Sequence, residues 1–157
     1  MTRLRGRAPR GQRCHARAPA GHWQTTTMLC ALRLDGTTAA MAIAGATDTE
    51  VFRAYVSQVL VPTLRPGDLV IMDNLAPHKS EPTLALIRAA GAEALFLPAY
   101  SPDLNPIEKM WSKVKNSLRR QEARTPEDLV AAIGTALAQV TAQDALGYFT
   151  SCGYSFC

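Results

Sequence analysis

The sequence lacks any run of about 18 apolar residues, the length that a transmembrane helix requires. It also lacks internal repeats and low-complexity tracts. Apolar residues make up 47% of the chain, an ordinary fraction, and 157 residues are enough for one domain with a single core. We therefore expect a globular protein with no membrane partner.

Metal-site spacing is also missing from the cysteines. None of them forms a C-x-x-C pair, and no secretory signal begins the chain. The simplest interpretation is that all four cysteines are reduced thiols: Cys14, Cys30, Cys152 and Cys157. Cys14 with His15 and His22 offers too few ligands for a zinc site.

Acidic residues are absent from the first 34 positions, which contain seven arginines. Residues 1–35 carry a net charge of +6, whereas the rest of the chain carries −2. The segment is too rich in glycine and proline for the amphipathic helix of a transit peptide, so residues 1–22 are expected to be a basic arm or loop. Such an arm suits a polyanion partner, and a solvated basic tail is the equal alternative.

Turn signals divide the remaining chain into short elements. Trp23–Leu34 and Thr37–Ala44 are expected to pair as a hairpin around the turn Asp35-Gly36. Thr47 or Asp48 then caps a helix over residues 48–64, which Pro66-Gly67 closes.

A β-α-β unit is expected next, which implies a parallel pair of strands. Its strands are Leu69–Asp73 and Glu93–Leu97, and residues 74–80 are expected to form a loop. The helix between them starts near Pro82 and ends at Ala90 with Gly91 as its cap. Three further helices are expected to start at Asn105-Pro106, to run from Thr125 to about Thr141, and to cover Gln143–Thr150. This order fits an α/β fold with a mixed sheet and helices on both faces.

Two carboxylates occupy positions that suit phosphoryl chemistry. Asp73 stands at the carboxyl end of a buried strand, where the sites of open α/β sheets gather. Glu108 lies in the first turn of the helix that starts at Asn105-Pro106. Oxygen ligands of this kind suit Mg²⁺ or Mn²⁺. The alternatives are structural: Asp73 opens a turn with Asn74, and Glu108 completes a capping box with Asn105.

Four stretches carry a resemblance to a known family. They are RLRGRAPRGQR from Arg3, VIMDN from Val70, the triplet His78-Lys79-Ser80, and FLPAYSPDLNPIEKMWSKVKNSLR from Phe96. Together they resemble the catalytic domain of bacterial insertion-sequence transposases of the family numbered 630, which are relatives of the mariner transposases and DDE recombinases. The likeness runs from about Arg3 to Tyr154. The 34 residues between Asp73 and Glu108 match the spacing known for the second and third acids of that superfamily.

The resemblance implies a ribonuclease H-like mixed sheet flanked by helices over residues 23–157. It implies that Asp73 and Glu108 are catalytic and hold metal, with two Mg²⁺ or Mn²⁺ ions about 3.5–4 Å apart in the complete site. Such a site would cleave the element ends and transfer strands into target DNA. The implied partners are DNA, as terminal inverted repeats and target, and a second copy or a further N-terminal part of the transposase. The implied location is a bacterial cytoplasm, at the nucleoid.

Supporting roles follow for other residues. Asn74, His78 and Asn105 would orient a ligand, a water or the scissile phosphate, and local backbone bonding is the alternative. Trp111 is expected in the core, and Tyr100 either packs or contacts DNA. The residues expected to contact DNA phosphates are Arg3, Arg5, Arg7, Arg10, Arg13, Lys113, Lys115 and Arg119. A solvated helix face is the alternative for the last three.

One departure from the family pattern limits the expected activity. No residue matches its first acid, because Asp35 lies in a hairpin turn and Asp48 starts a helix. The family's helix-turn-helix region and first strand have no counterpart here either. We expect the C-terminal part of a transposase that is inactive alone and is destabilised by exposed strand edges. The alternative is a catalytically dead DNA-binding or dimerising remnant.

Overall fold

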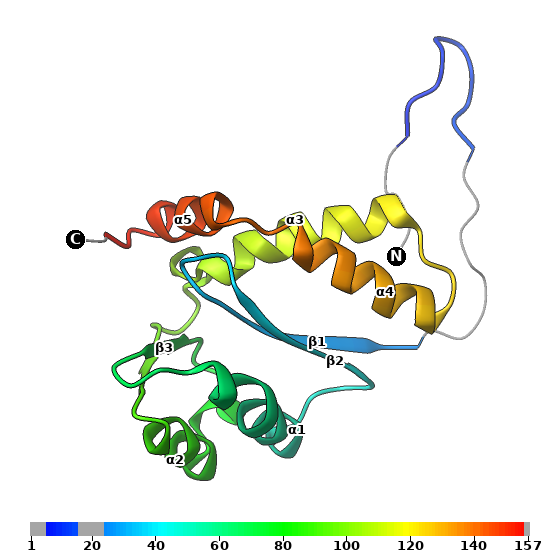
Figure 1. The fold of residues 1–157 in the computed structure, drawn as a ribbon. Coiled ribbons are helices and arrows are strands. Elements are labelled where there is room, and N and C mark those ends of the chain that lie inside the picture. Colours follow the sequence, from blue (N-terminus) through cyan, green and yellow to red (C-terminus); the bar gives the residue numbers. More distant parts are fainter. Residues whose placement is uncertain (1–5, 16–23, 156–157) are drawn as a thin grey trace. The chain divides into compact units, whose positions relative to one another are not determined.

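The computed structural model describes residues 6–15 and 24–155 (Figure 1). These residues fall into two compact units. The smaller contains the described part of Met1–Trp23 together with Trp111–Gln139, and the larger contains Gln24–Met110 together with the described part of Val140–Cys157. Helix α3 (Pro106–Gln121) contributes residues to both. The predicted basic arm 1–22 is described only over residues 6–15, so Arg3 and Arg5 lie outside.

The predicted hairpin is confirmed in the larger unit. Strands β1 (Thr26–Leu32) and β2 (Thr38–Ala44) pair antiparallel from Thr26 opposite Ala44 to Leu32 opposite Thr38. The Asp35 carboxylate accepts from the Thr37 N–H at 2.8 Å, and Gly36 adopts a φ of 85° that favours glycine. Trp23, where the strand was expected to begin, lies outside the described residues.

The predicted parallel pair is confirmed as well. Strands β3 (Leu69–Met72) and β4 (Glu93–Phe96) pair in parallel and are joined through helix α2 (Glu81–Ala89). Pro82 lies in the first turn of α2, and Gly91 follows its end with a φ of 76°.

The strands form two separate ladders within the part of the chain that is described: β1 with β2, and β3 with β4. The expected single sheet is therefore split in two, because no ladder joins β1 to β3 among the described residues. Both ladders nevertheless contribute to one core, because Leu29 of β1 and Val70 of β3 pack against the cluster that includes Phe52 and Met72.

The predicted helix over residues 48–64 has the expected extent and an unexpected interior. It begins as α1 (Thr49–Tyr55), capped by Asp48, whose carboxylate accepts from the Val51 N–H at 2.8 Å. It continues as a π-helical stretch, Val56–Leu60, and ends as a 3₁₀ turn, Val61–Thr63. Pro62 has no N–H to give to an α-helical bond, so the last turns adopt other bonding. Helices α1 and α2 lie side by side (Figure 1).

The prediction of a plain loop over residues 74–80 is wrong, because Ala76–Lys79 form a 3₁₀ turn. Pro77 fixes a helical φ inside this turn, and the His78 N–H donates to the Leu75 carbonyl at 3.1 Å. The turn places His78 close to the end of β3.

Two helices follow α3. In the smaller unit α4 (Pro126–Ala138) begins at the predicted cap, where the Thr125 hydroxyl accepts from the Asp128 N–H at 3.1 Å. The expected extension of α4 to Thr141 is wrong, because Thr141 forms a capping box with Asp144 and starts α5 (Ala142–Ser151) in the larger unit. In the described part, no single helix is long and apolar enough to cross a membrane; α4 and α5 pass that test only when taken together, by length and composition.

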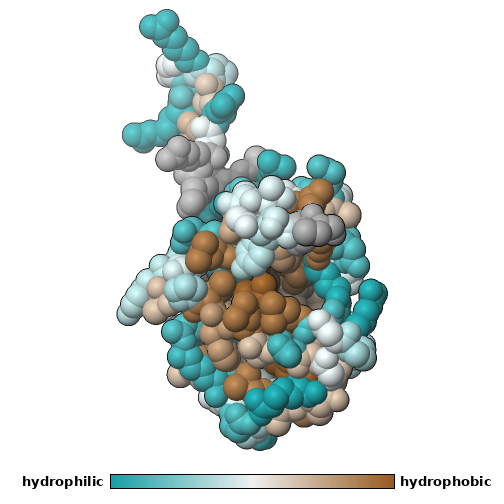
Figure 2. All heavy atoms as spheres, turned by 90° about the vertical axis from the view of Figure 1, so that its left-hand side faces the viewer, coloured by the Kyte–Doolittle hydropathy of each residue, from teal (hydrophilic) through white to brown (hydrophobic). Residues whose placement is uncertain are grey.

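Several large apolar side chains are exposed in the larger unit. Leu69 of β3 and Leu95 of β4 are 53% and 47% exposed, and Leu75 is 57% exposed. Figure 2 shows apolar atoms gathered on one face of the molecule. Parallel strands are usually covered on both faces, so the outer side of β3 and β4 is unusually open.

Candidate active site

Asp73 is the first residue after β3, and local bonds fix its position. The strand continues to Met72, whose carbonyl accepts from the Leu97 N–H at 2.8 Å across the ladder. The chain then turns, and the Leu75 N–H donates to the Asp73 Oδ1 atom at 3.3 Å. The Asp73 side chain remains 47% exposed. Its carboxylate is therefore anchored at one oxygen and open to solvent.

Glu108 is reached from the same edge of the ladder. Because β3 and β4 are parallel and Met72 pairs with Phe96, Leu97 follows β4 beside the point where Asp73 follows β3. The connection from Leu97 to α3 then delivers Glu108, in the first turn of α3, as an exposed side chain of the larger unit. Both predicted acids thus follow the carboxyl edge of the β3–β4 ladder.

The predicted capping box of Asn105 and Glu108 is not formed as expected. The Asn105 side chain caps α3 only through a long bond, from the Ile107 N–H at 3.4 Å. The Asn105 N–H donates to the Pro102 carbonyl at 3.1 Å within the 3₁₀ turn Pro102–Leu104. The backbone N–H that a capping box would pair with the Glu108 side chain thus bonds to a backbone carbonyl.

His78 lies directly against Asp73. Its Nδ1 atom is 2.6 Å from the Asp73 Oδ1 atom, and the imidazole is 18% exposed. The ring packs on Phe52 of α1, with ring centroids 4.3 Å apart. Asn74, the other predicted neighbour, is exposed.

The turn before Glu108 is held by a residue that sequence reasoning did not select. The Tyr154 hydroxyl donates to the Leu104 carbonyl at 3.0 Å, and its ring meets Phe149 of α5 edge to face. Burial raises the pKa of the Tyr154 hydroxyl above its usual value. No sequence pattern around Tyr154 predicts this contact, because the contact depends on how α5 packs.

Asp73 and Glu108 are hard oxygen donors, and their chemistry fits a Mg²⁺ or Mn²⁺ ion. Among residues 6–15 and 24–155, however, no group of three or more His, Cys, Asp or Glu side chains could hold a metal ion. The donor type therefore fits the metal that the resemblance implies.

The described basic residues predicted to meet DNA all belong to the smaller unit. Arg7, Arg10 and Arg13 are exposed, on a segment that turns where the Gln12 N–H donates to the Pro9 carbonyl at 3.0 Å. Over its described residues this unit has eight basic and three acidic side chains, whereas the larger unit has six and ten. Positive charge is thus concentrated in the unit that contains neither Asp73 nor Glu108.

The α3 cations differ in their surroundings. Lys115 is exposed, and the Arg119 guanidinium donates to the Asn116 side chain at 3.1 Å. Lys113 is half-buried and donates to the Gln139 carbonyl at the end of α4, at 2.7 Å. That bond supports the α4 C-terminus and competes with a phosphate contact. Trp111, expected in the core, is half-buried.

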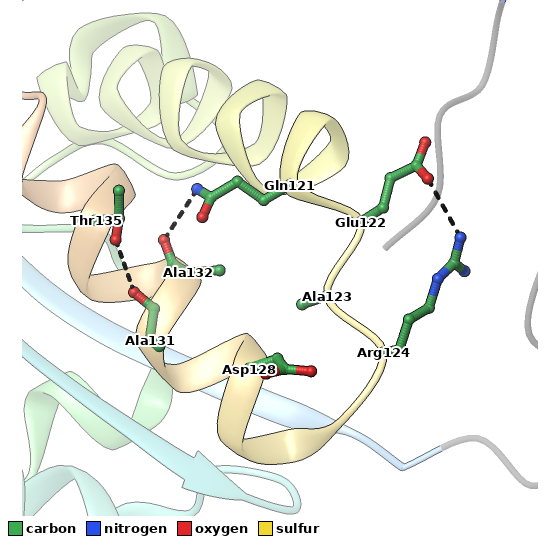
Figure 3. A pocket seen from close by; sticks show the side chains of 8 residues that line it. All are labelled: Gln121, Glu122, Ala123, Arg124, Asp128, Ala131, Ala132 and Thr135. Carbon is green, nitrogen blue, oxygen red and sulfur yellow. Dashed lines mark hydrogen bonds and ion pairs between the residues drawn. The ribbon is translucent and has the colours of Figure 1, made fainter.

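An open pocket of about 310 Å³ lies where α3 turns into α4 (Figure 3). The Gln121 side chain donates to the Ala132 carbonyl, and the Thr135 hydroxyl donates to the Ala131 carbonyl. These two polar side chains of the pocket therefore bond to the backbone of α4. The pocket contains neither Asp73 nor Glu108. Its lining is Gln121, Glu122, Ala123, Arg124, Asp128, Ala131, Ala132 and Thr135.

Comparison with known proteins adds three findings. The family model described as DDE superfamily endonuclease matches residues 1–130. The human histone-lysine N-methyltransferase SETMAR is 34% identical over 65 residues, which are 41% of this chain and 10% of SETMAR. The crystal structure of the Mos1 strand transfer complex superposes with a TM-score of 0.71 and 16% identity, over 99% of this chain and 51% of that one. The chain thus spans about half of the Mos1 chain, and the expected ribonuclease H-like α/β fold is confirmed.

Proposed function

Because this chain belongs to the DDE superfamily endonucleases, we propose that Asp73 and Glu108 are two of the acids with which a transposase cleaves and joins DNA phosphodiesters. The observation that carries the proposal is their shared placement: Asp73 follows β3, and Glu108 lies in the first turn of the helix reached from the end of β4. In finer detail the proposed protein is a bacterial insertion-sequence transposase of the family numbered 630, acting on DNA at the nucleoid. Residues 23–157 would form its catalytic domain.

The two carboxylates would hold divalent metal, Mg²⁺ or Mn²⁺. A bound divalent ion supplies activation of the attacking hydroxyl and stabilisation of the leaving oxygen. Asp73 would offer the oxygen that does not bond to Leu75, and Glu108 would offer its exposed carboxylate from the first turn of α3. The family as a whole uses divalent ions, and two ions are proposed for the complete site.

A third acid is proposed to come from outside this sequence. The described residues hold no third side chain that could complete the site, and Asp35 is occupied in its hairpin turn by the Thr37 N–H. With two acids, metal binding is weak and the reacting groups are poorly placed. The chain alone is therefore expected to show no DNA cleavage until a further part of the transposase supplies that acid.

DNA is the proposed partner, in the form of terminal inverted repeats and target. The described residues of the smaller unit carry a net charge of +5 with histidine neutral, and those of the larger unit carry −4. Exposed arginines neutralise phosphates and release counterions, so the basic arm and the exposed end of α3 would supply most of the affinity. The second candidate function is a DNA-binding remnant without catalysis, which the same charge distribution favours.

The first test is Mn²⁺ binding to the full chain, followed by the electron paramagnetic resonance signal of the free ion. Asp73→Asn and Glu108→Gln are each expected to weaken binding at least tenfold, because each removes a charged oxygen ligand. Glu93→Gln is the matched control, since Glu93 is an exposed acid at the opposite end of β4. Equal binding by all four proteins would reject the proposed site.

Cleavage is measured in parallel with supercoiled plasmid and Mg²⁺. We expect no nicking by the chain alone. Nicking that disappears in Asp73→Asn would contradict the inactivity while supporting the catalytic role of Asp73. DNA binding that weakens with salt, without any Asp73-dependent metal binding, would favour the remnant.

A further inference from the structure

His78 forms a close polar contact with the candidate metal ligand. The distance from His78 Nδ1 to Asp73 Oδ1 is 2.6 Å, and the same nitrogen is 3.4 Å from the Asp73 carbonyl oxygen. An ionised carboxylate only accepts hydrogen bonds, so the proton of a neutral His78 must lie on Nδ1. The geometry thus assigns a tautomer to the imidazole.

This contact makes the two oxygens of Asp73 unequal. Oδ1 accepts from both the His78 ring and the Leu75 N–H, the latter at 3.3 Å. Among the described residues no hydrogen bond reaches Oδ2, and the side chain is 47% exposed. Two donors on Oδ1 restrict rotation of the carboxylate and leave Oδ2 open to a ligand.

The imidazole is itself held in place by the core. It packs on the Phe52 ring with centroids 4.3 Å apart and planes inclined by 38°. Phe52 is 5% exposed and belongs to the main hydrophobic cluster. The His78 N–H is bonded to the Leu75 carbonyl at 3.1 Å, so backbone and ring are both fixed. Asp73 is therefore connected to the core of the larger unit through one side chain.

We propose that His78 is the positioning residue of Asp73: its Nδ1–H holds Oδ1 and presents Oδ2 to a divalent ion. This inference rests on the proposed metal role of Asp73. Hydrogen-bond partners of metal ligands act in this way, and their removal typically lowers metal affinity about 10–100-fold. Phe52 supports the arrangement by fixing the plane of the imidazole.

Two substitutions separate the hydrogen bond from the packing. His78→Asn retains a donor, since the side-chain amide Nδ2 can take the place of Nδ1. His78→Phe retains a ring on Phe52 and removes the donor. We expect Mn²⁺ affinity within about threefold of the original chain for His78→Asn and a loss of about tenfold or more for His78→Phe.

The outcomes distinguish the two levels of the proposal. Lost binding in Asp73→Asn with unchanged binding in His78→Phe would overturn the positioning role alone. Unchanged binding in Asp73→Asn would overturn the metal role and the positioning role together. A loss in His78→Asn with unchanged binding in His78→Phe would assign the effect to packing on Phe52 and also overturn the positioning role.

A readout without metal completes the test. Nitrogen-15 spectra of the imidazole in the full chain report which ring nitrogen carries the proton. We expect the Nδ1–H form in the original chain and its loss in Asp73→Ala. An Nε2–H form in the original chain would overturn the inference whatever the metal titrations show.

Discussion

Tyr100 combines backbone strain with complete exposure. Its φ is 58°, in the left-handed region that favours glycine, and its side chain is fully accessible at 102%. The sequence left open whether Tyr100 packs or contacts DNA, and this exposure excludes packing within the described chain. A residue held in this region of backbone space costs stability.

Replacing Tyr100 tests this strain directly. Tyr100→Gly is expected to raise the free energy of unfolding by about 1 kcal/mol relative to Tyr100→Ala, because glycine adopts a positive φ without a Cβ clash. Both variants lose the ring, so the comparison isolates the backbone. Urea unfolding at neutral pH measures the difference. Equal stability of the two variants would show that the loop relaxes without strain.

Sequence reasoning located the candidate acids because their signals are local. Asp73 follows an apolar strand, and Glu108 follows a Pro-containing helix start, so neighbouring residues indicate both positions. The contact of His78 with Phe52 had no such signal, because it joins the turn after β3 to the face of α1. Contacts between elements require the packing, and the sequence alone does not supply it.

At the scale of elements, the hairpin turn packs against the start of α5 at Gly36. A Cβ atom there would lie 2.7 Å from the Ala142 N atom and 2.7 Å from the Thr141 carbonyl carbon. Gly45, at the other end of β2, has a φ of 101° with nothing within 4 Å of its Cβ position. The two glycines share a positive φ and differ in their surroundings.

This pair provides a matched experiment. Gly45→Ala is expected to lower the free energy of unfolding by about 1 kcal/mol through backbone strain alone. Gly36→Ala is expected to cost at least about 1 kcal/mol more, because the turn must move away from the backbone of α5. Denaturant unfolding of both variants gives the comparison. Equal costs would mean that the hairpin turn and α5 are not packed together in solution.

The elements themselves were predictable where turn chemistry marks their ends. Asp35-Gly36, Pro66-Gly67 and Gly91 bound strands and helices that the structure confirms. The π-helical stretch Val56–Leu60 was not predictable, because its apolar spacing also fits an α-helix. Nor did spacing reveal the division of the sheet, since strand pairing depends on partners far apart in sequence.

At the scale of the whole molecule, one ion pair connects the two ladders of the larger unit. Arg33 follows β1 directly, and Asp68 directly precedes β3. Their side chains form a bidentate pair with 27% and 23% exposure, and Arg33 also donates to the Thr63 carbonyl at 2.8 Å. The pair therefore bridges β1 and β3, between which no backbone ladder exists in the described chain.

The Asp68 carboxylate makes this connection dependent on pH. The hydrogen bond from Arg33, followed by that from the Arg65 N–H at 2.7 Å, lowers the pKa of Asp68 below its ordinary value. A carboxyl group with a lowered pKa in the folded state stabilises that state above its unfolded pKa of about 3.9. The stabilisation is lost as the pH falls through the lower, folded value.

Asp68→Asn is therefore expected to lower the free energy of unfolding by about 1–2 kcal/mol at pH 7, a cost typical of a bond between charged groups. The difference from the original chain should shrink as the pH falls below about 4, where the unfolded Asp68 becomes protonated. Glu81→Gln is the control, because the Glu81–Arg88 pair is exposed and should contribute less than about 0.5 kcal/mol. Urea unfolding between about pH 2.5 and 7 measures the free energy of unfolding of both variants, and this range includes the ordinary pKa of a carboxyl group. A pH-independent cost for Asp68→Asn would show that the ion pair does not join the two ladders in solution.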